Sequence, residues 1–259
     1  MSLSTQFASS PSPTPPFHCV GCGACCKGRF IPLTLAEAQQ WLKRGHEVAV
    51  LLEAFEVSTW PQAPQAYAYN VQRSAPVRCG EQTLQVTAIL AGQAIPRCPN
   101  LGGDDRCGIY AERPLVCRIY PMEINPFIAL RISDKECPPE SWAAPATLAT
   151  DRAEEREVLA NIERSRQADR ADAARKIALC QDLGLTTAAW KGNGLAIYFP
   201  LRDALLQAIE RLPASASPRL GGDWQVRVVD TALRERLSGL PLAFDEGEPL
   251  NYLFHPVSA

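Results

Sequence analysis

The chain has few of the features that mark the large functional classes. Its 26 basic and 28 acidic side chains nearly cancel, to a net charge of −2. A nucleic-acid-binding protein presents a basic face, so this balance gives no support to a nucleic-acid partner. The longest apolar runs, such as 124–130 and 195–201, fall far short of the roughly 18 residues that a membrane span requires. We therefore expect neither a nucleic acid nor a membrane as partner.

The N-terminal segment lacks the parts of an export signal. Residues 1–16 have neither a basic start nor an apolar core, and they are rich in Ser, Pro and Thr. This composition predicts a disordered tail. Ten cysteines without an export signal indicate a reducing compartment, where thiols persist as thiolates or metal ligands. The expected localisation is therefore cytoplasmic.

Motifs of several enzyme classes are absent as well. The sequence contains no P-loop, no Gly-x-Gly-x-x-Gly fingerprint and no Ser-His-Asp constellation. Among the three histidines, His46 and His255 have no partner at ligand spacing and are expected to be structural. His18 adjoins Cys19 and is a conceivable substitute ligand, but thiols are in surplus, so an exposed loop histidine is the simpler expectation.

Cysteine, by contrast, is concentrated at two places. Four thiols fall within eight residues, at Cys19, Cys22, Cys25 and Cys26. Disulfides explain this crowding poorly, because their geometry requires Cα atoms about 4.4–6.8 Å apart and a fixed torsion. One metal ion or iron–sulfur cluster readily collects thiolates from a single tight loop. We therefore expect metal ligation.

A second cysteine-rich stretch begins at Cys98. Gly-Gly-Asp-Asp at 102–105 is a strong turn signal, so the loop is predicted to bring Cys98 and Cys107 together. Pro114 suits the first position of a helical turn, where its missing N–H costs nothing. Cys117 then lies one turn into that helix, near amides whose dipoles favour a thiolate.

Eight of the ten cysteines are candidate metal ligands. Cys79 lies in a Cys-Gly turn and is set aside as a stray thiol. Cys180 falls on the last turn of a predicted helix, where a small buried hydrophobe is the simpler expectation. The candidate ligands are Cys19, Cys22, Cys25, Cys26, Cys98, Cys107, Cys117 and Cys137. Eight thiols fill two four-ligand sites, or one site and part of a second, provided that the fold brings the two stretches together.

These positions resemble the CxxCxxCC (YkgJ-type) family of zinc- or iron-chelating cysteine-cluster proteins. The resemblance covers roughly residues 17–140 and lies in two motifs: Cys19-x2-Cys22-x2-Cys25-Cys26, and Cys98-x8-Cys107-x-Ile109-Tyr110-x2-Arg113-Pro114-x2-Cys117-Arg118-x-Tyr120-Pro121. The family includes flagellin lysine N-methylases, which are usually longer. Residues after 146 show no such resemblance, so the question of an enzyme, either an iron–sulfur oxidoreductase or a lysine N-methylase-like protein, stays open.

The cofactor that these thiols imply is an iron–sulfur cluster or zinc. Soft thiolates accept both. The Cys-x2-Cys-x2-Cys run and the prolines after Cys98 and Cys137 are typical of ferredoxins, whereas Cys22-Gly23 is equally natural in a zinc knuckle. The resemblance favours the iron–sulfur cluster. It also implies that Arg113 and Arg118, which belong to the motif, hydrogen-bond around the cofactor.

Three functions are compatible with these features. An iron–sulfur protein would serve electron transfer or a methyl-transfer-type reaction on a protein or small molecule. A structural zinc would support an interaction module, and a labile cluster would store or deliver metal. Ligand excess favours the first and third, because a structural zinc needs only four ligands. The absence of other cofactor or substrate motifs favours the second. An unidentified protein partner or substrate fits each of them.

Local patterns predict an α+β fold. Expected helices are 34–44, opened by a Thr34-x-x-Glu37 capping box, 48–57, 150–184, 201–212 and 231–240. The helix at 150–184 is expected either as one long rod or as two pieces broken near 168–173. Expected strands are 67–71, 82–90, 128–132, 195–199 and 224–229. We expect a disordered tail at 1–16, an irregular metal-stapled cysteine-cluster domain at 17–145, and a helix-rich region with a small α/β element at 146–259.

Overall fold

The computed structural model describes residues 17–57, 60, 63–142, 150–219, 221 and 224–257, without the side chains of 150–153. The fold is α+β, as the sequence predicts. Its strands are β1 (Lys27–Leu33), β2 (Val48–Phe55), β3 (Ala75–Cys79), β4 (Gln82–Arg97), β5 (Thr187–Trp190), β6 (Gly194–Tyr198), β7 (Gln225–Arg227) and β8 (Leu253–Pro256). Its helices are α1 (Leu35–Lys43), α2 (Pro64–Gln72), α3 (Leu115–Ile119), α4 (Thr150–Asp182), α5 (Arg202–Arg211) and α6 (Thr231–Leu237). The tail expected at 1–16 lies outside the described residues.

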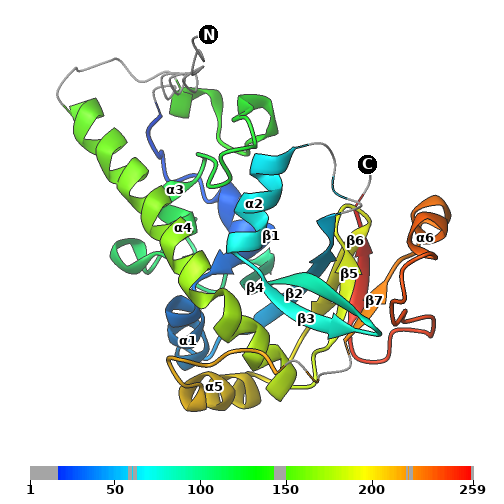
Figure 1. Cartoon of the computed structure of the whole chain (residues 1–259). Coiled ribbons are helices and arrows are strands. Elements are labelled where there is room, and N and C mark those ends of the chain that lie inside the picture. Colours follow the sequence, from blue (N-terminus) through cyan, green and yellow to red (C-terminus); the bar gives the residue numbers. More distant parts are fainter. Residues whose placement is uncertain are drawn as a thin grey trace, which may run out of the picture.

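The strands of the described chain join one mixed sheet. Its main path runs β1-β4-β2-β5-β7, with β3 beside β4 and with β6 joining β2 to β8. The long strand β4 pairs with β1 and β3 along one side and with β2 along the other. Strands from 27–97 and from 187–256 therefore share the sheet, while α4 lies alongside it as a long rod (Figure 1). The domain boundary near 145 stays a prediction.

Most of the expected elements are present. The helix at 34–44 is confirmed as α1, with Thr34 and Glu37 forming the capping box. The long helix is confirmed as α4, and the chain leaves it through Gly184 at a φ of 70°. The strands at 82–90, 195–199 and 224–229 and the helices at 201–212 and 231–240 correspond to β4, β6, β7, α5 and α6. The short strands β5 and β8 were not predicted.

The helix predicted at 48–57 is wrong, because these residues form the central strand β2. Seven of its eight residues are buried. Val50 and Leu52 pack into the main core, while Ala49 and Leu51 pack into a small cluster on the other face. A strand that is covered on both faces reads as a continuous apolar run, and periodicity alone does not distinguish it from a buried helix.

The strands predicted at 67–71 and 128–132 are also wrong. The first segment lies within α2, which has Pro64 in its first turn, and Tyr67 packs edge-on against Phe55 at 5.9 Å between ring centroids. Aromatic β-propensity misled the prediction there, since packing decides between helix and strand. The second segment is irregular and runs into a 3-10 turn, Ile132–Asp134. It pairs with no strand of the described chain.

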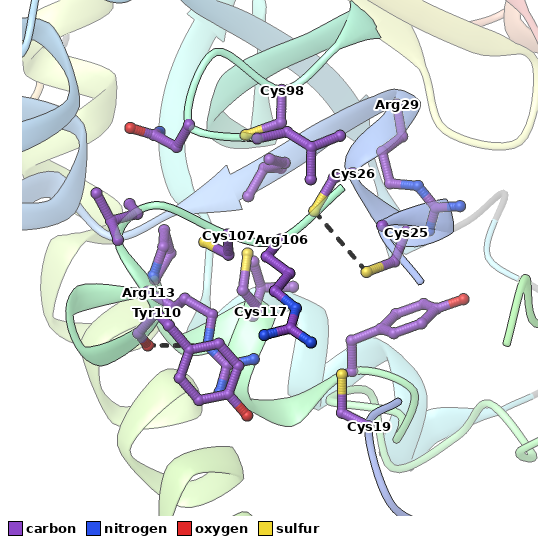
Figure 2. Close-up of a pocket in the computed structure, with 18 of the residues that line it drawn as sticks. Cys19, Cys25, Cys26, Arg29, Cys98, Arg106, Cys107, Tyr110, Arg113 and Cys117 are labelled. Atoms are coloured by element: carbon purple, nitrogen blue, oxygen red, sulfur yellow. Dashed lines mark hydrogen bonds between the residues drawn. The ribbon is translucent and has the colours of Figure 1, made fainter. Parts of the chain in front are cut away.

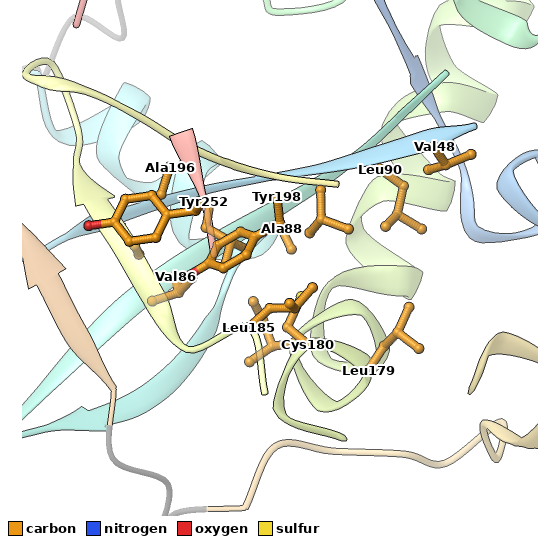
Figure 3. Packing of buried hydrophobic residues seen from close by; sticks show 14 of the residues in the cluster. Val48, Val86, Ala88, Leu90, Leu179, Cys180, Leu185, Ala196, Tyr198 and Tyr252 are labelled. Atoms are coloured by element: carbon orange, nitrogen blue, oxygen red, sulfur yellow. The ribbon is translucent and has the colours of Figure 1, made fainter. Parts of the chain in front are cut away.

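The C-terminal part of α4 covers one face of the sheet. Leu179 and Cys180 face Ala88 and Leu90 of β4 across the main core (Figure 3). Cys180 is 1% exposed, and burial raises the pKa of its thiol to about 12, so it stays protonated and apolar. Cys79 is also buried and donates to the carbonyl of Ala243 at 3.3 Å. Both thiols therefore belong to the core.

No helix of the described chain combines the length and the apolar character needed to cross a bilayer.

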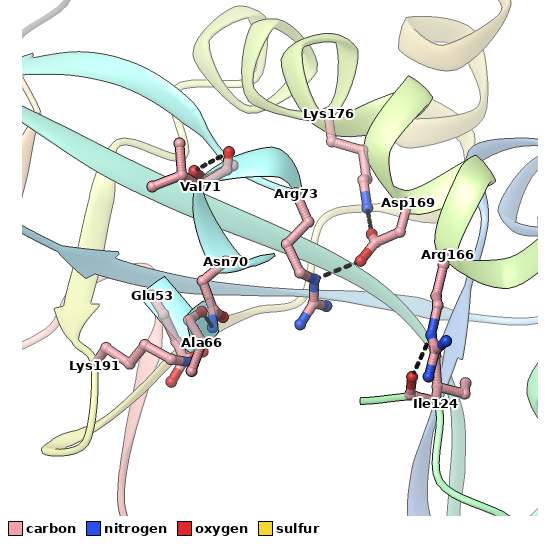
Figure 4. Close-up of polar contacts among 11 residues, drawn as sticks. Glu53, Ala66, Asn70, Val71, Arg73, Ile124, Arg166, Asp169, Lys176 and Lys191 are labelled. Atoms are coloured by element: carbon pink, nitrogen blue, oxygen red, sulfur yellow. Dashed lines mark hydrogen bonds and ion pairs between the residues drawn. The ribbon is translucent and has the colours of Figure 1, made fainter. Parts of the chain in front are cut away.

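A partly buried ion network ties α4 to the end of α2. Asp169 accepts from Lys176 Nζ and from Arg73 Nε, each at 2.6 Å (Figure 4). Lys176 is only 2% exposed. Burial by itself raises the pKa of Asp169, but the two cations outweigh it and hold the pKa below its ordinary value. Asp169 is therefore the counterion that makes the burial of Lys176 tolerable.

Replacing Asp169 with asparagine is expected to destabilise the fold by about 3 kcal/mol, because it leaves a buried ammonium without its counterion. The wild-type contribution is present above the ordinary carboxyl pKa of about 3.9 and is lost as pH falls through the lowered pKa. Denaturant unfolding of both proteins at neutral and acidic pH measures this difference.

Asp182→Asn on the same helix is the matched control. Asp182 pairs with Arg219 at 3.2 Å, but both side chains are more than half exposed. An exposed pair contributes only about 0–1 kcal/mol. Equal losses from the two substitutions would contradict the assigned role of Asp169.

Candidate metal centre

The pairing of β1 with β4 brings the two cysteine stretches together. Cys26 immediately precedes β1 and Cys98 immediately follows β4, and the antiparallel register sets Lys27 opposite Arg97. The Cys98 N–H donates to the Cys26 carbonyl at 2.7 Å. Residues 72 positions apart thus become neighbours through the sheet.

The loop after β4 is the hairpin that the turn signal predicts. Gly102 N–H donates to the Arg106 carbonyl and Gly108 N–H to the Asn100 carbonyl, each at 2.8 Å. Leu101 forms an isolated bridge with Cys107. The hairpin therefore sets Cys98 and Cys107 on its two arms.

The loop at 19–26 packs closely on this hairpin. Gly23 has a φ of 67°, and a Cβ added there would lie 2.7 Å from the Asp105 carbonyl oxygen. Lys27 also pairs with Asp105, at 3.0 Å. A side chain at Gly23 would push the two cysteine-bearing loops apart, so the close contact of these loops requires glycine at this position.

Helix α3 brings in Cys117. Pro114 occupies the N-cap position of this helix and not its first helical position, which is a shift of one residue from the prediction. The Leu115 N–H donates to Glu37 Oε1 at 2.7 Å, while Glu37 Oε2 accepts from the Thr34 N–H at 2.9 Å. One carboxylate therefore caps both α1 and α3 and anchors the helix that carries Cys117.

Six of the eight candidate cysteines line one pocket of about 540 Å³. They are Cys19, Cys25, Cys26, Cys98, Cys107 and Cys117 (Figure 2). Cys22 and Cys137 do not line it. Burial, followed by the charges of Cys25 and Cys22, raises the pKa of the Cys137 thiol to about 11. The structure thus gathers six candidates in the pocket, with the other two close to Cys25 or its loop.

Hydrogen bonds between thiols produce unequal pKa values in the cluster. Cys25 Sγ lies 4.0 Å from Cys26 Sγ, and hydrogen bonds from Cys26 lower the pKa of both Cys25 and Cys98 to about 6. The same bonds raise the pKa of Cys26 itself. Burial, followed by the charges of neighbouring thiolates, raises the pKa of Cys117 to about 12.

This arrangement suits a bound cation. Thiolates crowded into one pocket repel each other, and a metal ion replaces their shared protons while relieving the repulsion. Two thiolates on one tetrahedral zinc at about 2.3 Å lie about 3.8 Å apart, close to the separation in the vicinal pair. With the side chains as they stand, no three His, Cys, Asp or Glu residues of the described chain are arranged to hold an ion. The donors gathered in the pocket are thiols, which are the ligands that a soft metal binds.

The two motif arginines have different surroundings. Arg113 lines the pocket, stacks 3.6 Å above the centroid of the Tyr110 ring and helps to lower the pKa of Cys25. Arg118 does not line the pocket; it donates to the carbonyls of Arg113 at 2.9 Å and Ala111 at 2.5 Å. Arg113 thus offsets thiolate charge directly, whereas Arg118 braces the loop that presents Arg113.

Sequence reasoning missed Asn100, a lining residue of the same pocket. Its position two residues after the candidate ligand Cys98 is the sequence feature that could have indicated its place in the site. Of the histidines, His18 donates its backbone N–H to the Ser141 carbonyl at 2.9 Å, and His46 Nε2 lies 3.2 Å from Asn100 Oδ1. His255 lies on the edge strand β8.

Comparison with known proteins agrees with the location of this centre. A family model, CxxCxxCC, described as "Putative zinc- or iron-chelating domain", matches residues 18–138, just under half of the chain. Searches of curated proteins and of solved structures returned no match. The matched range contains all eight candidate ligands and ends one residue after Cys137. Residues 18–138 of the chain are therefore similar to the CxxCxxCC family of zinc- or iron-chelating domains.

Proposed function

We propose that the cysteine cluster holds an iron–sulfur cluster that acts on a ligand in the adjoining pocket. The observation that carries this proposal is the convergence of six cysteines on one open pocket of about 540 Å³. A structural zinc site is closed and uses four ligands, whereas this site has a surplus of thiols and free space beside them. Electron transfer, or a group transfer to a small molecule or protein side chain, is the chemistry that such a centre supports.

The eight thiols divide into an inner and an outer group. The inner group is Cys26, Cys98, Cys107 and Cys117, and the outer group is Cys19, Cys22, Cys25 and Cys137. Besides burial, the charges of Cys98 and Cys107 raise the pKa of Cys117, whereas those of Cys22 and Cys19 raise the pKa of Cys137. Cys25 adjoins both groups. The inner group is the proposed set of cluster ligands, because Cys26 and Cys98 flank the paired strands β1 and β4, and Cys107 and Cys117 line the same pocket.

A structural zinc is the second candidate, and the vicinal pair favours it. The 4.0 Å between Cys25 Sγ and Cys26 Sγ is close to the spacing of two ligands on one tetrahedral zinc. In the iron–sulfur proposal only one member of this pair binds the cluster. The two candidates therefore differ at this pair: a structural zinc would bind both Cys25 and Cys26, whereas the iron–sulfur cluster would bind Cys26 alone.

Metal analysis with an absorption spectrum distinguishes the candidates. The full chain, purified without oxygen, is expected to be brown, with iron and sulfide in equal amounts and a broad visible absorption. One zinc per chain without a visible band would overturn the iron–sulfur proposal and favour the structural site. Purified protein without either metal would overturn metal binding.

A further inference from the structure

We propose that His46 and Asn100 form a hydrogen-bonded pair that aims an amide N–H at the sulfur of Cys98 in the metal centre. The inference rests on the proposed metal binding and adds a positioning role for two residues that are not ligands. His46 lies outside the two cysteine motifs, and Asn100 occupies one of the unspecified positions between Cys98 and Cys107. Their place in the fold, where the end of α1 meets the hairpin after β4, supplies the argument.

The side-chain amide of Asn100 has one satisfied end and one orphaned end. Its Oδ1 lies 3.2 Å from His46 Nε2. Its Nδ2 is buried and has no hydrogen-bond partner in the described chain. Buried amide donors without a partner are rare in folded proteins. Because the side chain lines the cysteine pocket, an acceptor supplied by the loaded centre would satisfy Nδ2.

Cys98 is the acceptor that the local geometry offers. Asn100 follows it by two residues. The Asn100 side chain makes no full hydrogen bond to Cys98, but it and the backbone N–H lie near enough to add to the effect of Cys26 in lowering the pKa of the Cys98 thiol. The backbone carbonyl of Asn100 accepts from Gly108 N–H at 2.8 Å, which fixes the residue within the hairpin. A metal-bound thiolate accepts N–H donors more strongly than a neutral thiol does.

His46 is itself held in place. It follows Gly45 at the end of α1, and its backbone N–H donates to the Trp41 carbonyl at 3.3 Å. Its ring packs edge-on against Trp41, 5.5 Å between centroids. Since Oδ1 only accepts, His46 donates from Nε2, and this bond turns the opposite face of the amide towards the pocket. His46 therefore decides which end of Asn100 faces the metal centre.

The test compares full-length metal-loaded proteins. Asn100→Leu removes the donor, and the nearly isosteric Asn100→Asp replaces it with an acceptor. Both are expected to release their metal to a chelator about 10–100-fold faster than wild type, as loss of an outer-shell partner does elsewhere. In protein loaded with cobalt(II), both should also shift the thiolate-to-metal charge-transfer band. His46→Leu should behave similarly, and His46→Gln, which restores a donor, should recover the wild-type rate.

Asn70→Leu is the matched control. Asn70 is 5% exposed, donates to the Ala66 carbonyl within α2 and does not line the pocket. It should lower stability without changing metal release or the cobalt spectrum. Unchanged release and spectrum in both Asn100 variants would refute the inference, as would an equal effect of Asn70→Leu. A wild-type chain that holds no metal refutes the proposed function, whereas a metal-holding wild type with unchanged Asn100 variants refutes this inference alone.

Discussion

Replacing Cys117 with alanine is expected to strip the metal from the centre, whereas the same substitution at Cys180 leaves the metal bound. Cys117 lines the pocket on α3, and the charges of Cys25, Cys98 and Cys107 act on its thiol. Losing a ligand should weaken metal retention by more than the roughly 10–100-fold that loss of an outer-shell partner costs. Metal content after gel filtration measures the difference.

Cys180→Ala is matched because it also removes a buried thiol with a raised pKa of about 12. Cys180 lies on α4 and packs into the main core, and it does not line the pocket. Its loss should reduce stability modestly, through a small cavity, and leave the metal content unchanged. A Cys180→Ala protein without metal, or a Cys117→Ala protein that keeps it, would show that the ligand set is wrong.

Removing the metal is expected to lower the unfolding free energy of the chain by about 4 kcal/mol when free metal had stood near 1,000 times its dissociation constant. For a chain of this size, that corresponds to a fall of about 8–16 °C in the melting temperature. The physical reason is that the centre joins the loop at 19–26, the hairpin at 98–107 and α3, which otherwise meet through few backbone hydrogen bonds. Thermal unfolding with reductant, before and after chelation, measures the shift.

Cys117→Ala supplies the control for chelation. Since that variant is expected to lack metal already, its melting temperature should not respond to the chelator. The sheet core under α4, which Figure 3 shows, should persist in both proteins as strand and helix signals. Equal melting temperatures for loaded and chelated wild type would contradict a centre that holds these segments together.

The sequence predicted local structure best where one side chain decides it. The capping box at Thr34 and Glu37 and the turn residues at 102–105 act within a few positions, and α1 and the hairpin appear as predicted. The segment 48–57 failed because a strand buried on both faces carries no alternation. Tertiary packing decides that this segment is a strand, and the local sequence pattern does not reveal that packing.

The candidate site divides in the same way. The cysteine spacings and the family motif identified the thiols, because ligand spacing is a local property. Cys26 and Cys98 lie close together because β1 pairs with β4, and this pairing joins residues that are far apart in the sequence. Asn100 and His46 meet only because the end of α1 lies beside the hairpin, so no spacing in the sequence relates them.

The metal content of the full chain, purified without oxygen or chelators, tests the central claim most directly. We predict at least one equivalent of bound iron or zinc per chain, with iron and sulfide favoured. We also predict its loss when Cys26 and Cys98 are both replaced by alanine. Wild-type protein that is folded, reduced and free of metal above trace amounts would contradict the account.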